Sequence, residues 1–175
     1  YSQRLGSDFL LTFGHDYRGG GYWRFRIPTG RGEFIRLNVH ARLIPGENTV
    51  RLDFQWPAGR KRPHYLGDGH AVQLILRPDI ESRNFHDTTK AYSGPEHSWP
   101  AALKARPQGF RFHPQPGPML VVNTNNGRFL PEPEWQYMVH RPLEAERGLD
   151  SDSDLYSPGR AGRREPGAFQ LPPAA

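Results

Sequence analysis

The chain has 175 residues, a length that suits one domain whose hydrophobic core is large enough to be stable without disulfides or a structural metal. It contains no cysteine, which excludes disulfides, cysteine-ligated metal sites and thiol catalysis. Its net charge of +5 comes from basic side chains interspersed with acidic ones, a distribution typical of a solvated surface rather than of a clustered nucleic-acid-binding face. No apolar run approaches the roughly 20 residues of a membrane-spanning helix.

The first half of the chain shows apolar and polar residues alternating with a period of two, the pattern of a strand with one buried face. This alternation predicts strands at 9–13, 23–27, 35–43 and 50–56. The turn-forming residues 45–48 join the last two strands. We therefore expect the second, third and fourth of these strands to form an antiparallel meander.

The second half predicts shorter strands, at 71–77, 110–112, 119–124, 134–140 and 168–171. Asn126 and Gly127 provide the positive φ angles of a tight turn, so a hairpin is expected there between 120–122 and 128–130. The only helix signal is residues 141–148, with proline near its start and glycine at its end.

Regular short strands separated by turns predict an all-β fold, an antiparallel β-sandwich of the super-sandwich type with at most one or two short helices. We expect residues 1–175 to form a single such domain, excised from a longer enzyme. Within it, residues 141–166 are expected to form a short helix and a loop that leads into the last strand.

Residues 78–107 lack this alternation, although they are polar and rich in aromatic side chains. A loop of this length in a compact domain is usually functional. The loop offers flat rings at Tyr92 and Trp99 beside hydrogen-bonding groups, which is the composition of a sugar-binding site. The same residues also fit a structural role, in which Trp99 covers the core and the polar groups tie the loop down. Composition alone leaves both interpretations open.

The sequence evidence for a metal site or a hydrolase site is weaker. Asp150, Asp152 and Asp154 have the spacing of a calcium loop, but Leu155 stands where that loop needs glycine and Ala161 where it needs glutamate, so we expect a polar loop without metal. The Gly-x-Ser-x-Gly motif of serine hydrolases is absent from the sequence. We expect no metal and no cofactor.

Several segments resemble the N-terminal region of glycogen debranching enzymes of the bacterial and archaeal amylo-α-1,6-glucosidase type. These segments are residues 76–86, 92–100, 133–138, 144–150 and 153–159, and the last three blocks are the most specific. The resemblance implies a cytoplasmic enzyme in which a β-sandwich precedes an (α/α)₆ barrel that carries the catalytic carboxylates. It therefore implies no catalytic residue in this chain, and it makes the block 144–158 either a binding element or the seam toward the barrel.

The resemblance implies a non-catalytic domain that recognises substrate or acts as a scaffold, with an α-glucan and the C-terminal catalytic barrel as its partners and no membrane. The expected substrate-binding residues are Asp79, Asn84, His86, Glu96, His97 and Trp99. A domain separated from its barrel is also expected to expose apolar side chains, near Leu149, Leu155 and Tyr156.

Two alternatives stay open. The fragment itself could hydrolyse glycosidic bonds with carboxylates such as Glu96 and Asp79, in which case the isolated chain would cleave an α-glucan. Arginines interleaved with aromatic residues on a β-surface could instead bind single-stranded nucleic acid, and binding would then fall steeply with salt.

Overall fold

The computed structural model describes residues 7–17, 19–57, 63–67, 69–85 and 87–162. These residues fall into two compact units, which we describe separately. Unit 2 contains the described residues up to Val72, and unit 1 contains those from Gln73 onward. The predicted all-β fold of antiparallel sheets is confirmed.

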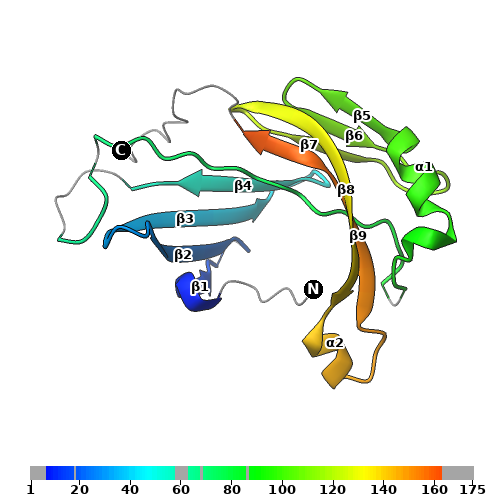
Figure 1. Cartoon of the computed structure of the whole chain (residues 1–175), viewed down its shortest axis with the longest axis horizontal. Coiled ribbons are helices and arrows are strands. Elements are labelled where there is room, and N and C mark those ends of the chain that lie inside the picture. Colours follow the sequence, from blue (N-terminus) through cyan, green and yellow to red (C-terminus); the bar gives the residue numbers. More distant parts are fainter. Residues whose placement is uncertain (1–6, 18, 58–62, 68, 86, 163–175) are drawn as a thin grey trace. The chain divides into compact units, whose positions relative to one another are not determined.

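Unit 2 is one four-stranded antiparallel sheet with the strand order β1-β2-β3-β4 (Figure 1). After a short 3-10 helix at Ser7–Phe9, its strands are β1 (Leu10–His15), β2 (Gly21–Pro28), β3 (Phe34–Leu43) and β4 (Val50–Gln55). The expected meander is confirmed, and β1 adds a fourth strand to its edge.

The alternation read from the sequence gives this sheet two different faces. Trp23, Phe25 and Ile27 lie on one face, opposite apolar residues of β3. On the other face the strand register aligns polar side chains in rows across the strands, among them Tyr22, His40 and Asp53. The row beside it contains Arg24, Asn38 and Gln55.

Unit 1 contains two smaller sheets. One has the order β5-β6-β7, from Leu103–Arg106, Gly109–Phe112 and Leu120–Asn123. The other pairs the long strands β8 (Arg128–His140) and β9 (Asp152–Gly162), which appear in Figure 1 as a curved ribbon. Its helices are η2 (Ala91–Ser93), α1 (Pro95–Ala102) and α2 (Pro142–Glu146).

An aromatic core holds unit 1 together. It combines Phe110 and Phe112 of β6, Phe129 of β8, Tyr156 of β9 and Trp99 of α1, all at most 6% exposed. Rings of this size bury large apolar areas, so this cluster packs β6, β8, β9 and α1 of the unit together.

Two predictions about strands are wrong. The hairpin expected around Asn126 and Gly127 does not form, because β7 pairs with β6 and β8 pairs with β9. The turn is present, with Gly127 at φ 85°, but it connects two different sheets. Residues 71–77 do not form a strand, and Leu76 alone forms an isolated bridge with Ala161 of β9.

The segments expected to be irregular are more ordered than predicted. Residues 78–107 include η2, α1 and β5, and the expected helix at 141–148 is present as α2. Asp152 and Asp154, expected in a polar loop, lie in β9, which pairs with β8; their side chains bind His140 of β8 and the Ala91 N–H. The strand predicted at 168–171 lies outside the described residues.

Candidate functional site

The first residues of β9 hold the segment before α1 in place. The carboxylate of Asp154, only 3% exposed, accepts hydrogen bonds from the backbone N–H groups of Ala91 at 2.7 Å and of Met138 at 2.9 Å. The Ser153 hydroxyl accepts a hydrogen bond from the Thr89 N–H at 2.9 Å. Asp154 and Ser153 thus accept hydrogen bonds from backbone N–H groups that no neighbouring strand pairs, and in this way they fix the segment around residues 89–91.

A second anchor lies at Glu81, whose side chain is 15% exposed. It accepts hydrogen bonds from the Ser153 hydroxyl at 2.5 Å and from Arg141 at 2.6 Å, and it also pairs with Arg83 at 3.2 Å. Burial alone would raise the pKa of Glu81, but these hydrogen bonds and the two guanidinium charges outweigh it and lower the pKa below its ordinary value. The carboxylate therefore stays ionised and fixes the start of the loop.

The expected binding residues are only partly brought together. Asp79 is exposed and accepts a hydrogen bond from the Gln136 amide at 3.1 Å. Asn84 and His97 are exposed, and Glu96 is half-buried in the first turn of α1. His86 lies outside the described residues.

Trp99 is placed in the core. It is 5% exposed and its ring contacts Phe112 at 5.2 Å, Trp135 at 5.3 Å and Tyr156 at 6.1 Å between centroids. This environment matches the structural role that composition left open, because a buried ring has no free face for a ligand. Leu155 and Tyr156, expected in an exposed apolar patch, are also buried, at 6% and 1%, and only Leu149 is exposed.

Glu96 meets a partner that the sequence did not single out. The Tyr137 hydroxyl donates a 2.7 Å hydrogen bond to its carboxylate, and this bond raises the pKa of the Tyr137 phenol above its ordinary value. The Tyr137 ring, 49% exposed, is nearly parallel to that of Trp135, with centroids 6.4 Å apart. Trp135 in turn contacts Trp99, so the stack runs from the core to the surface.

We name this exposed ring and its carboxylate, Tyr137 with Glu96, the tyrosine platform. Its position follows from an irregularity in β8, where the register shifts between Gln136 and Val139 and Met138 adopts φ 54°. The alternation of 134–140 places Trp135 and Tyr137 on one face of β8, a signal available in the sequence. The pairing with Glu96 was not available there, because it joins residues 41 positions apart.

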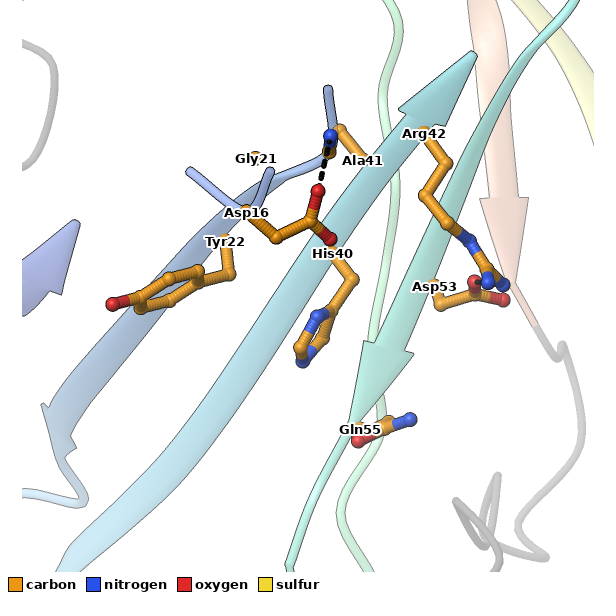
Figure 2. A pocket seen from close by; sticks show the side chains of 9 residues that line it. Asp16, Gly21, Tyr22, His40, Ala41, Arg42, Asp53 and Gln55 are labelled. Atoms are coloured by element: carbon orange, nitrogen blue, oxygen red, sulfur yellow. Dashed lines mark hydrogen bonds and ion pairs between the residues drawn. The ribbon is translucent and has the colours of Figure 1, made fainter. Parts of the chain in front are cut away.

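Unit 2 carries a pocket of about 200 Å³ on the polar face of its sheet (Figure 2). Tyr22 comes from β2, His40 and Arg42 from β3, and Asp53 and Gln55 from β4. The remaining lining residues are Asp16, Gly20, Gly21 and Ala41. We call this the sheet pocket.

Charges in the sheet pocket are largely balanced. Asp53 forms ion pairs with Arg42 at 2.9 Å and Arg51 at 2.8 Å. Burial raises the pKa of Asp53, but hydrogen bonds and charges of both arginines outweigh it, so the pKa lies below its ordinary value. The Asp16 carboxylate accepts a hydrogen bond from the Gly20 N–H at 2.8 Å, as the dashed line in Figure 2 shows.

The alternation of the first half of the chain did predict this polar face, but we placed the site in the loop instead. A pocket depends on which polar side chains the register places in one row, and on the small residues beside them. The sequence shows these residue types but not the register that brings them into one pocket.

The part of the chain that the structure describes contains no cluster of three or more His, Asp or Glu side chains able to hold a metal ion. Among these residues, no helix is long and apolar enough to cross a membrane. No curated protein and no solved structure shows a significant match to the chain. A protein-family model does match: the family described as glycogen debranching enzyme N terminal matches residues 3–162. Because this match covers nearly the whole sequence, the chain belongs to the glycogen debranching enzyme N-terminal family.

Proposed function

We propose that this chain is the non-catalytic, α-glucan-recognising domain of a glycogen debranching α-1,6-glucosidase. The family supports the enzyme context, since its description places the domain at the N-terminus of glycogen debranching enzymes. In this proposal a separate catalytic domain of the parent enzyme cleaves the bond, and the present domain helps to hold the glucan beside it.

The tyrosine platform is the observation that carries the recognition role. A sugar ring presents C–H groups that pack on an aromatic face and hydroxyl groups that need directed hydrogen bonds. Tyr137 supplies a half-exposed ring supported from below by Trp135, and Glu96 supplies an acceptor next to it. Exposed His97 and Asp79 belong to the same loop segment and are the further contacts that we propose.

The hydrogen bonds of two candidate carboxylates support a non-catalytic role. A glycosidase needs a pair of carboxyl groups free to act on the glycosidic bond. Glu96 and Asp79 instead accept hydrogen bonds from the Tyr137 hydroxyl and the Gln136 amide.

Calorimetric titration of the 175-residue chain with maltoheptaose tests recognition, with the β-linked cellohexaose as the matched sugar. We expect saturable binding of the α-linked sugar that Tyr137→Ala weakens by up to about tenfold, since contact with an aromatic face contributes about 0.5–1.5 kcal/mol. Tyr137→Phe keeps the ring and should retain most of the affinity.

Tyr92→Ala provides the comparison within the loop. It removes a ring that is 81% exposed and outside the Trp99–Trp135–Tyr137 stack, and we expect it to leave the affinity unchanged. Equal affinity of wild type and Tyr137→Ala for maltoheptaose would refute the platform. Release of reducing sugar from a branched α-glucan by this chain, abolished in Glu96→Gln, would overturn the non-catalytic role.

A further inference from the structure

The sheet pocket contains hydrogen-bonding groups that the fold itself does not use. Asp16 and Asp53 are engaged, by the Gly20 N–H and by two arginines. The side chains of Tyr22, His40 and Gln55 form no hydrogen bond with any other residue that the structure describes, although Tyr22 and His40 lie side by side with ring centroids 6.4 Å apart. One pocket thus presents a phenol, an imidazole and an amide together.

The charge balance of the sheet pocket selects against strongly charged ligands. Two carboxylates, Asp16 and Asp53, and two guanidinium groups, Arg42 and Arg51, lie in or beside it, so their formal charges cancel and a polyanion such as phosphate gains no net attraction. A cation is disfavoured as well, because the Asp53 charge is already shared by Arg42 and Arg51. A neutral ligand with many hydroxyl groups fits both constraints, since it can donate to the carboxylates and accept from the arginine, phenol and amide groups.

The volume and walls of the sheet pocket further limit the ligands that it can bind. The pocket volume of about 200 Å³ lies below the range of roughly 300–1,000 Å³ typical of sites for drug-sized ligands, so it suits one small ring. Tyr22 provides an aromatic wall that a close approach of backbone keeps in position: a Cβ atom built on Gly14 would lie 2.6 Å from the Tyr22 hydroxyl oxygen. Glycine at this position lets the ring lie directly over β1.

We propose that the sheet pocket is a second carbohydrate site, which binds a single hexose unit through Tyr22, His40, Gln55 and the carboxylates of Asp16 and Asp53. The choice of a sugar follows from the pocket. Its assignment to a glucosyl unit of an α-glucan rests on the proposed function. Two sites on one chain would bind a branched or long glucan more tightly than either site alone, provided that one glucan can reach both.

Amide NMR spectra of the 175-residue chain test this directly, with maltose and inorganic phosphate as probes. Maltose should shift the backbone amides of Gly21, Ala41 and Gln55 in a saturable manner. Gln55→Ala, which removes an exposed amide without a described partner, should weaken this response about fivefold, the loss expected for one hydrogen bond.

Gly14→Ala forces the Tyr22 ring to move without removing any group of the sheet pocket, and it should weaken maltose binding at least as much. Gly67→Ala, where an added Cβ meets no atom within 4 Å, is the matched control and should leave binding unchanged.

The outcomes separate the two proposals. Shifts at the pocket amides that persist in Tyr137→Ala support the sheet pocket even if the tyrosine platform fails. Shifts confined to residues around Tyr137 overturn the pocket and leave the proposed function standing. Phosphate-induced shifts without maltose-induced ones overturn the assignment of a sugar to the sheet pocket. The absence of any shift at about 50 mM maltose, well above the Kd of even a weak site, overturns both proposals.

Discussion

Replacing Asp154 by alanine should destabilise unit 1 more than any other single loss of a polar side chain described above. The carboxylate is 3% exposed and accepts two backbone hydrogen bonds, from Ala91 at 2.7 Å and Met138 at 2.9 Å. Each hydrogen bond to a charged group contributes about 1.5–3 kcal/mol. Ala91 is fully buried, so its N–H would be left without a partner, whereas Met138 is exposed enough for water to replace the carboxylate.

These contributions give a loss of about 3–5 kcal/mol for Asp154→Ala, against a total stability of about 5–15 kcal/mol for a typical domain. Asp154→Asn retains one acceptor oxygen and should lose about 2 kcal/mol. Urea unfolding measures both values, and a thermal midpoint lower by about 10 °C should accompany the alanine variant. Hydrogen exchange at the Ala91 and Met138 amides reports the local effect independently.

Asp150→Ala is the matched control, since Asp150 is exposed and accepts one long hydrogen bond, 3.3 Å, from Thr88. It should cost no more than about 0.5 kcal/mol. If Asp154→Ala and Asp150→Ala have the same free energy of unfolding, the reasoning that Asp154 satisfies buried backbone groups is refuted.

Three further changes test the packing and electrostatics. The folded-state pKa of Glu81 is lowered, so its carboxylate stabilises the fold fully above the unfolded-state pKa of about 4.3, and this stabilisation is lost as the pH falls through the folded-state pKa. The difference in unfolding free energy between wild type and Glu81→Gln should therefore shrink as the pH falls below about 4.3. A difference that grows on acidification contradicts a lowered pKa for Glu81. Trp99→Ala should cost about 3–5 kcal/mol in urea unfolding, because it leaves a cavity in the aromatic core, whereas Trp99→Phe should recover much of that loss. Gly109→Ala should prevent β6 from pairing correctly with β7, because the added Cβ would lie 1.9 Å from the Val122 carbonyl oxygen. Circular dichroism should show a loss of sheet structure in this variant and no loss in Gly67→Ala, where an added Cβ meets no atom within 4 Å.

Local sequence patterns were sufficient for the sheet of unit 2. Alternation in β2, β3 and β4 defines the strands and separates their apolar from their polar faces, and the turn at residues 45–48 makes β3 and β4 neighbours. The same reasoning failed at Asn126 and Gly127, where a correct turn was assigned to the wrong pairing. A turn specifies the local direction of the chain, whereas long-range packing decides which strand each segment joins.

Polar and proline-rich stretches were the other source of error. Pro95 and Pro100 concealed α1: proline is well tolerated at the first helical position, where Pro95 lies, but Pro100 lies inside the helix, where proline is normally unfavourable. Asp152 and Asp154 looked like loop residues because nothing in the sequence shows that the backbone at Ala91 and Met138 needs acceptors. The residues that meet in the tyrosine platform and in the sheet pocket are also far apart in the sequence. The sequence therefore shows which residue types are present but not which of them come into contact.

The anchoring of the long loop to β9 also sets an order of events during synthesis. Arg77, Thr89, Lys90 and Ala91 make hydrogen bonds to β9 across sequence separations of 62–80 residues. At a translation rate of about 5–20 residues per second, these groups wait about 3–16 s for their partners to be made. The sheet of unit 2 has no such delay, because its strands are hairpin neighbours. During this interval the strands of unit 2 have their pairing partners in the nascent chain, whereas the loop and the aromatic side chains of unit 1 still lack those that β9 supplies.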